Sequence, residues 1–225
     1  MIKIFETTDK YPLQKIGLMA GVCWNSPVDD KEKNINRAKD CIKSGHGRVL
    51  EFIDIELCIS DYSARAIREY YTHIGGGPTR LQESTRYVNC DKFEYYNPPT
   101  IKKSEEAEKV YNDCIEYIRK SYTELLNKGV SKEDAANILP LGMMTKVVDK
   151  RNLRNMINLM NQRLCSRAYA EIRQMANEIK QALSDYSEEW KWICDNLFVS
   201  KCDVVGFCTE IKCCGRKPKK ESVNG

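Results

Sequence analysis

One stretch of the chain, residues 75–87, is dense in side chains that bind anions or hydrogen-bonding ligands. Its second half carries guanidinium, amide, carboxylate and hydroxyl groups at Arg80, Gln82, Glu83, Ser84 and Arg86. Arginine pairs with phosphate or carboxylate groups through two parallel hydrogen bonds. Three glycines and a proline at residues 75–78 interrupt helices and strands, so we expect a loop here. The stretch predicts a pocket for an anionic ligand.

Arg163 is the second candidate for chemistry. It follows Met156 by seven residues and Met160 by three, so on a helix it shares their apolar face. A guanidinium on such a face is costly unless it is paired. The spacing leaves two interpretations equally open. In the first, Arg163 makes a structural salt bridge, within the chain or to another subunit. In the second, it binds an anion or a heterocycle.

The two histidines, His46 and His73, do not predict a metal site. His46 lies between two glycines, which suits close approach of the backbone to a ligand but also suits an exposed turn. His73 directly precedes the glycine-rich loop. Neither histidine belongs to a pattern of metal ligands, and the glycines at residues 75–77 follow an expected helix, so they are not a dinucleotide-binding fingerprint. We expect no bound metal.

Composition describes an ordinary globular chain. It has 225 residues, of which 42% are hydrophobic and 30% charged, which predicts a domain over residues 1–200 and a basic, cysteine-rich tail over 201–225. No apolar run approaches the length of a membrane span, and the N-terminus lacks the apolar core of a signal peptide. We therefore expect a cytoplasmic protein with no membrane partner. The net charge of +4 lies partly in the tail and does not predict nucleic-acid binding.

Cysteine is abundant, with eleven residues in the chain. Five of them gather near the C-terminus, at Cys194, Cys202, Cys208, Cys213 and Cys214. Their spacing matches no compact zinc motif. We expect unpaired thiols, while a metal or disulfide staple of the tail stays open.

Hydrophobic periodicity predicts the elements that hold these residues. Alternating apolar residues indicate a strand over 51–60 with one buried face, and residues 1–8 and 141–148 also suit strands. Apolar residues at helical spacing predict helices over 13–22, 29–43, 63–71, 104–127 and 152–183, the last being the longest. Ser131 is expected to cap a short helix after residue 130. The fold class is α+β, with a central, mainly antiparallel sheet and several long helices.

Four segments together resemble a known enzyme family. Residues 45–52, GHGRVLEF, are similar to its G-H-x-S/T-V-x-E-H motif. Residues 63–67, SARAI, look like the helix before its signature, and residues 82–87, QESTRY, look like the signature's end, S-x-R-Y. Residues 152–168 resemble its N-x-R…N…L-R-x-x-S-H-A pattern. On these ordered matches the chain resembles the flavin-dependent thymidylate synthases.

The chain also departs from that pattern. The family signature normally opens R-H-R, whereas residues 72–74 read Thr-His-Ile, and the loop that follows is about two residues longer. Arg80 is a candidate to supply the missing charge from a new position. Phe52 and Arg167 stand where the family usually has histidine. A divergent subgroup of the same enzyme is expected.

The resemblance implies a function and a set of site residues. It implies reductive methylation of dUMP to dTMP, with FAD as cofactor, methylenetetrahydrofolate as carbon donor and NADPH as reductant. The implied dUMP-binding residues are Glu69, Gln82, Glu83, Ser84, Thr85, Arg86, Lys146 and Arg163, with Arg163 also catalytic. The implied FAD-binding residues are His46, Arg48, His73, Arg80, Asn152, Arg154 and Asn158.

The resemblance further implies a homotetramer with active sites at subunit interfaces. Two alternatives stay open at this point. One is a nucleotide-binding relative without catalysis, and the other is a flavoenzyme that acts on a different pyrimidine nucleotide.

Overall fold

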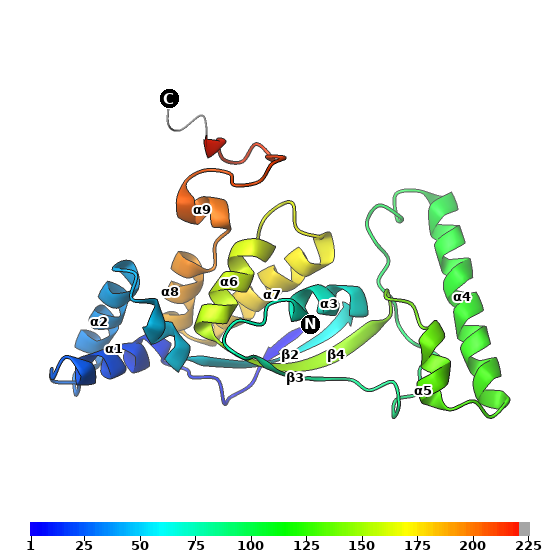
Figure 1. Ribbon diagram of the computed structural model, residues 1–225, viewed down its shortest axis with the longest axis horizontal. Helices are drawn as coiled ribbons and strands as arrows, with labels where there is room; N and C mark the ends of the chain where they lie inside the picture. The colour runs from blue at the N-terminus through cyan, green and yellow to red at the C-terminus, as the bar shows by residue number, and fades with distance from the viewer. Residues whose placement is uncertain (221–225) are drawn as a thin grey trace. The chain divides into compact units, whose positions relative to one another are not determined.

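A computed structural model describes residues 1–220 and confirms the α+β class (Figure 1). Four strands form one sheet in the order β1-β2-β4-β3. The strands are β1 (Ile2–Ile4), β2 (Asp54–Ser63), β3 (Thr79–Gln82) and β4 (Met144–Asn152). Backbone hydrogen bonds from Phe5 to Glu56 and from Ser60 to Met1 pair β1 with β2 in opposite directions, as expected for an antiparallel sheet.

Strand β2 has the buried face that its sequence predicts. Ile53, Ile55, Leu57 and Ile59 have 0% exposed area, while the residues between them are partly exposed. The strand begins at Asp54 instead of residue 51, because residues Gly47–Phe52 form a short 3-10 helix, η1. Burying each of these side chains stabilises the fold by about 1.5–3 kcal/mol. The β2 row of isoleucine and leucine is therefore a principal part of the core.

The chain folds as two compact units, and strands β2, β3 and β4 each contribute residues to both of them. One unit contains Met1, Ile59–Glu69 and Leu81–Val147, and the other contains Ile2–Cys58, Tyr70–Arg80 and Val148–Gly225.

The unit built around residues 81–147 has a small core between two helices. Helix α4 (Glu105–Asn127) packs against α5 (Lys132–Ala135) and η2 (Ala136–Ile138). Its core includes Ile115, Tyr122 and Phe93. Ser104 and Ser131 cap α4 and α5 by accepting hydrogen bonds from the backbone N–H of Ala107 and Asp134, and the expected cap of the short helix is confirmed.

The other unit contains the remaining helices. These are α1 (Pro12–Cys23), α2 (Lys31–Lys43), α6 (Leu153–Arg163), α7 (Ala170–Tyr186), α8 (Glu188–Leu197) and α9 (Lys201–Val205). Helix α3 (Ala64–Tyr71) begins in the first unit and ends in this one. Helix α7 packs against β1, α6 and α8, while α6 packs against η1 (Figure 1). These contacts hold α6, which carries the candidate Arg163.

The single helix expected over residues 152–183 is wrong. Helix α6 ends at Arg163 and α7 begins at Ala170. A turn lies between them, with the backbone N–H of Ala168 donating to the Cys165 carbonyl at 2.9 Å. Leu164 and Ala168 keep the apolar spacing through this turn, and neither glycine nor proline marks it. Periodicity alone therefore concealed the break.

Part of the stretch that was expected to be a loop is a strand. Residues 79–82 form strand β3 at the edge of the sheet, next to β4. The backbone N–H of Glu83 donates to the Lys146 carbonyl at 2.8 Å and continues the pairing. The glycines at 75–77 form a turn before this strand, as their conformational freedom permits.

The expected boundary between a domain and its tail at residue 200 stays a proposal. Helix α9 opens that segment, and residues 221–225 of the expected tail lie outside the described residues. Among residues 1–220, no helix is both long enough and apolar enough to cross a membrane.

Candidate active site

Arg163 is the last residue of α6 and its side chain is half-buried. Asn152 caps the other end of this helix by accepting a hydrogen bond from the backbone N–H of Asn155 at 2.9 Å. Met156 and Met160 are fully buried below the helix, as their spacing predicted. The helix end therefore places a guanidinium at the border between the apolar core and solvent.

His73 holds the guanidinium of Arg163. The Arg163 Nε donates to His73 Nε2 at 3.0 Å, and its Nη2 donates to Thr72 Oγ1 at 3.4 Å. A histidine that accepts at Nε2 must be neutral. Burial, and in the same direction the nearby charges of Arg163 and Arg151, lower the pKa of His73 to about 4. His73 therefore acts as a neutral acceptor that orients Arg163.

Protonation of His73 is expected to destabilise the fold. Because its pKa falls from 6.5 in the unfolded chain to about 4 in the fold, the unfolded state binds more protons between these values. The contribution of neutral His73 is thus complete above pH 6.5 and decreases as the pH falls toward 4. Urea unfolding should show a loss of about 2 kcal/mol between about pH 7 and pH 5.

The His73→Gln variant is the control for this prediction, because glutamine keeps an acceptor but does not titrate. It should lack that part of the pH dependence. Equal pH dependence in both proteins would contradict the assignment of a neutral, buried His73.

A fully buried ion pair lies below this site. Asp149 and Arg151, both on β4, have 0% exposed side chains and form two hydrogen bonds of 2.6 and 2.8 Å. The Tyr70 hydroxyl donates to the same carboxylate at 2.8 Å, and the Arg151 guanidinium stacks 4.0 Å from the centre of the Tyr70 ring. Burial raises the pKa of Tyr70 well above its usual value, so the hydroxyl stays a donor. These groups satisfy one another away from water.

Asn155 connects this ion pair to the glycine-rich turn. Its side-chain oxygen accepts from Arg151 Nη1 at 2.7 Å, and its Nδ2 donates to the carbonyls of His73, at 3.3 Å, and Gly75. The backbone on both sides of Ile74 is therefore fixed to α6. A network of hydrogen bonds thus runs from the sheet to the residue that orients Arg163.

The sequence patterns did not indicate the members of this network: Tyr70, Asp149, Arg151 and Asn155. A signal existed in β4, where Thr145, Val147, Asp149 and Arg151 alternate on its buried face. This alternation was an ambiguous signal, because Val147 and Val148 are both apolar. Both faces of the strand therefore carry apolar and charged residues, and the buried face could not be identified from the pattern.

The turn at Gly76 lies against Asn152. Gly76 has a φ of +79°, and a Cβ built there would lie 2.5 Å from Asn152 Nδ2. Only glycine fits this close approach at a positive φ without strain. Arg80 follows the turn; its Nη1 donates to the Tyr71 carbonyl at 3.0 Å and its guanidinium lies 4.5 Å from the Tyr71 ring centre. Arg80 and Asn152 thus both contact the segment that carries His73.

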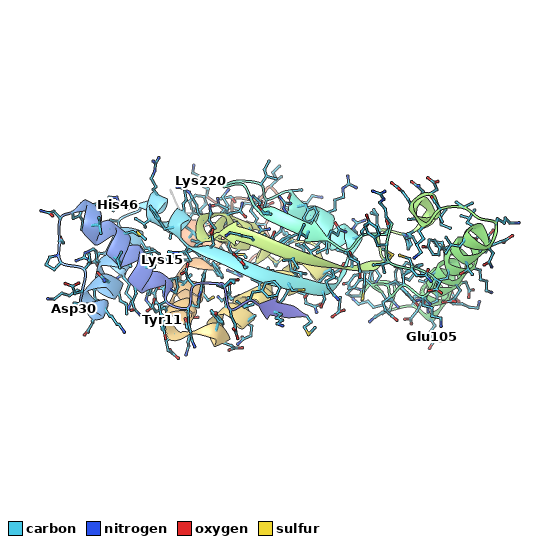
Figure 2. The ribbon with its side chains drawn as sticks, turned by 90° about the horizontal axis from the view of Figure 1, so that it is seen from below. Tyr11, Lys15, Asp30, His46, Glu105 and Lys220 are labelled. Carbon is cyan, nitrogen blue, oxygen red and sulfur yellow. The ribbon has the colours of Figure 1, made fainter. Side chains whose placement is uncertain are left out.

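The remaining residues of the expected FAD site divide into two places. Arg154 pairs with Glu51 at 2.9 Å and lies beside Gly47, whose missing Cβ would sit 3.3 Å from Arg154 Nη2. His46 and Arg48 flank Gly47 and are exposed, and Figure 2 shows His46 just beyond the end of α2. Arg154 is therefore brought to the glycine turn that sequence analysis selected.

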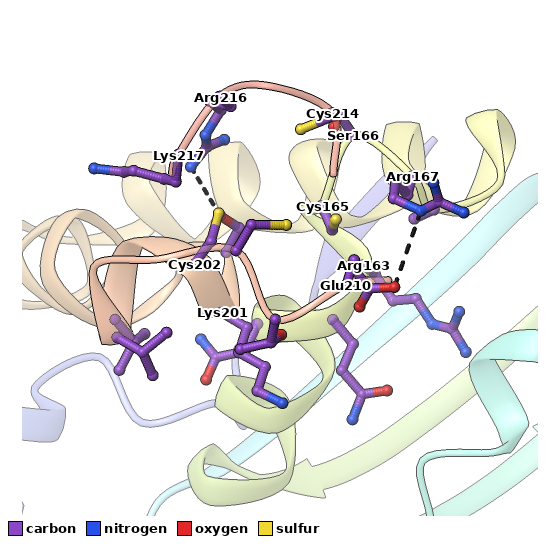
Figure 3. Close-up of a pocket in the computed structure, with 18 of the residues that line it drawn as sticks. Arg163, Cys165, Ser166, Arg167, Lys201, Cys202, Glu210, Cys214, Arg216 and Lys217 are labelled. Carbon is purple, nitrogen blue, oxygen red and sulfur yellow. Dashed lines mark hydrogen bonds and ion pairs between the residues drawn. The ribbon is translucent and has the colours of Figure 1, made fainter. Parts of the chain in front are cut away.

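Asn158 is exposed and lines a cavity of about 840 Å³ together with Arg163 (Figure 3). One wall is the end of α6 and the turn after it, including Cys165 and Arg167. The other wall is the chain after residue 200, including Lys201 and Arg216. Five basic side chains line this cavity: Arg163, Arg167, Lys201, Arg216 and Lys217.

The expected dUMP residues other than Arg163 lie in the unit built around residues 81–147. Gln82 Nε2 approaches Thr145 Oγ1 at 3.5 Å, at the end of β3. Ser84 Oγ accepts from the backbone N–H of Arg86 at 3.3 Å, and the Arg86 Nε pairs with Glu133 at 3.1 Å. Arg86 and Glu133 are each 61% exposed, so this pair is weak and open to exchange for a ligand.

The chain thus carries its candidate residues in two groups. The first unit contains Glu69, Gln82, Glu83, Ser84, Thr85, Arg86 and Lys146, and Glu83 and Lys146 are neighbours across the β3–β4 pairing. The second unit contains His46, Arg48, His73, Arg80, Asn152, Arg154, Asn158 and Arg163. Within residues 1–220, no group of three or more His, Cys, Asp or Glu side chains is arranged to hold a metal ion.

Comparison with known proteins identifies similar chains. The family model described as "Thymidylate synthase complementing protein" matches residues 4–186. Curated relatives named "Flavin-dependent thymidylate synthase" include one from Clostridium tetani, 26% identical over 221 residues, which cover 88% of this chain and 84% of the relative. The relative of that name from Nitratidesulfovibrio vulgaris is 26% identical over 86% of this chain and 81% of its own length. That from Pyrococcus furiosus is 29% identical over 81% and 74%.

Proposed function

Because the chain belongs to the thymidylate synthase complementing protein family, we propose that it is a flavin-dependent thymidylate synthase that converts dUMP to dTMP. The carbon donor in this proposal is methylenetetrahydrofolate and the reductant is NADPH. The cofactor is FAD. The observation that carries the proposal is Arg163, held by neutral His73 in the wall of a cavity lined by basic side chains.

Arg163 is the catalytic residue in this proposal. Its guanidinium binds the uracil ring of dUMP and favours the form deprotonated at N3, in which C5 is a better nucleophile. A fixed positive charge placed where negative charge develops lowers the barrier most when it needs no rearrangement. The hydrogen bonds to His73 and Thr72 supply that fixed orientation. Bound reduced flavin would supply the hydride that completes the methyl group.

The substrate-binding residues follow from the same assignment. Arg86 binds the phosphate of dUMP, exchanging its weak pair with Glu133 for a bidentate phosphate contact. The other dUMP residues are Glu69, Gln82, Glu83, Ser84, Thr85 and Lys146.

The residues around Gly47 and Gly76 suit a dinucleotide such as FAD. At Gly47 the backbone leaves space beside the guanidinium of Arg154, and His46 and Arg48 add donors on either side. Hydrogen-bond donors grouped around a glycine, where no side chain blocks approach to the backbone, suit the binding of a diphosphate. At Gly76 the Asn152 amide lies against the backbone. FAD is therefore assigned to His46, Arg48, His73, Arg80, Asn152, Arg154 and Asn158.

A homotetramer with active sites at subunit interfaces, in the cytoplasm, completes the proposal. Large apolar side chains are exposed within and beside the candidate segments, including Ile74 at 70%, Leu81 at 71% and Tyr87 at 78%. Exposed apolar groups next to functional residues are typical of surfaces that bind another molecule. Light scattering of the purified protein measures the mass of the assembly, and a monomer would contradict this part of the proposal.

An absorption spectrum and a turnover assay test the function. The purified protein is expected to show the visible bands of a bound flavin, released on denaturation. It is expected to convert dUMP to dTMP when supplied with methylenetetrahydrofolate and NADPH. Colourless protein that takes up no added FAD and makes no dTMP would contradict the proposal.

A further inference from the structure

The segment after α8 folds back on itself. The backbone N–H of Cys208 donates to the Pro218 carbonyl at 2.7 Å, which brings two distant parts of the segment together. Arg216 Nη2 donates to Ser200 Oγ at 2.8 Å, so the return of the chain is fixed to the start of the segment. The segment is therefore held together by contacts within itself. We call residues 200–220 the C-terminal segment. They lie beyond the part of the chain that the family model matches.

The C-terminal segment contacts the turn between α6 and α7. Arg167 Nη1 donates to the Lys212 carbonyl at 2.6 Å, and its Nε lies 3.9 Å from Glu210. Cys214 and Ser166 both line the cavity, and Ser166 lies close enough to stabilise the Cys214 thiolate. These contacts place the segment across the cavity whose opposite wall carries Arg163 (Figure 3).

Four free thiols line this cavity: Cys165, Cys202, Cys208 and Cys214. Only Cys165 belongs to the α6–α7 turn, so a cross-link between the turn and the segment must use it. On the other side, Cys208 is buried and Cys202 lies 3.2 Å from Ser200 Oγ within the segment itself. Cys214 is exposed and contacts Ser166, the neighbour of Cys165 in the chain.

Consecutive Cα atoms are about 3.8 Å apart, so the residue with which Cys214 interacts, Ser166, is directly beside Cys165. A disulfide needs Cα atoms roughly 4.4–6.8 Å apart, which a small movement of an exposed segment can supply. The hydrogen bond from Ser166, and the Arg167 charge more weakly, lower the pKa of the Cys214 thiol. The thiolate is the form that reacts with disulfides. Cys214 is therefore the attacking thiol and Cys165 the resolving one.

We propose that Cys165 and Cys214 form a reversible disulfide that fastens the C-terminal segment over the cavity beside Arg163. The oxidant is a low-molecular-weight disulfide. The Cys214 thiolate attacks one of its sulfur atoms and releases one thiolate, and Cys165, losing its proton, then attacks the Cys214 sulfur and releases the second. Two protein thiols are oxidised and one small disulfide is reduced to two thiols. A dithiol reverses the reaction.

The consequence for activity rests on the proposed function. In the oxidised protein the segment covers the cavity beside Arg163 and hinders entry of dUMP. In the reduced protein exposed polar contacts, such as that of Arg167 with Glu210, hold the segment, and these exchange readily with water. The disulfide would therefore switch the enzyme off under oxidising conditions.

Disulfide mapping tests the modification without any assay of activity. The full chain is equilibrated with oxidised glutathione, remaining thiols are alkylated, and the digest is analysed by mass spectrometry. The expected result is a peptide cross-linked through Cys165 and Cys214, absent from C165S and from C214S. The C23S variant, which removes another exposed cysteine, should keep it. A different pairing, or none, would overturn the proposal.

Measuring the binding of dUMP to the oxidised and the reduced protein tests the role of the cross-link. The oxidised protein is expected to lose dUMP binding, and a dithiol should restore it, whereas C165S should bind dUMP under both conditions. A mapped cross-link with unchanged dUMP association would overturn the covering role. Absence of dUMP binding in the reduced protein would instead contradict the proposed function, and the mapping result would stand independently.

Discussion

Replacing Arg163 with alanine is expected to reduce the turnover of dUMP by about 100- to 1,000-fold, the usual effect of removing one preorganised group that stabilises charge in a transition state. The variant removes the guanidinium that His73 orients at 3.0 Å. Because the side chain is half-buried at a helix end, its loss should leave α6 folded. Steady-state kinetics, together with the bound-flavin spectrum, measures both effects.

Two further variants make this result specific. Arg163→Lys keeps the charge but loses the planar, forked donor set, so it should recover only part of the activity. Gln162→Ala removes an exposed neighbour that lines the same cavity and should remain close to the parent enzyme. Near-normal kcat in Arg163→Ala would show that Arg163 is structural and not catalytic.

Replacing Arg151 with methionine is expected to lower the free energy of unfolding by about 3–5 kcal/mol, because the Asp149 charge is left buried without its partner. Both side chains of this pair have 0% exposure. Methionine fills a similar volume, so the loss reports the charge more than a cavity. The variant also removes a hydrogen bond to Asn155, which fixes the turn beside His73.

Lys150→Met is the matched control on the same strand. Lys150 is about half-exposed and pairs with Asp54 and Glu56 at 3.2 Å each, so its loss should cost at most about 1 kcal/mol. Urea unfolding of the two variants measures the difference. Removing both charges, in Asp149→Leu with Arg151→Met, should recover part of the stability. Equal losses for Arg151→Met and Lys150→Met would contradict a buried, mutually satisfied pair.

Local rules predicted the elements where a single signal dominated. Alternation in β2 corresponds to its buried row of side chains, and serine at position 131 caps a short helix as expected. The same rules failed at the α6–α7 turn, where apolar spacing continues through residues 164–169. They also failed at residues 47–52, which form a 3-10 helix before the strand. Periodicity records which side of an element is buried, not where that element ends.

The sequence by itself determined the α+β class, the family resemblance and the selection of Arg163 as a charge out of place on an apolar helix face. Only the tertiary structure decided what surrounds that charge. His73 lies 90 positions from Arg163 in the chain, and the C-terminal segment reaches Arg167 from 45 positions away. Such contacts depend on how the sheet, the helices and the glycine turn are packed. Short-range patterns cannot encode them, because they report only neighbours within a few residues.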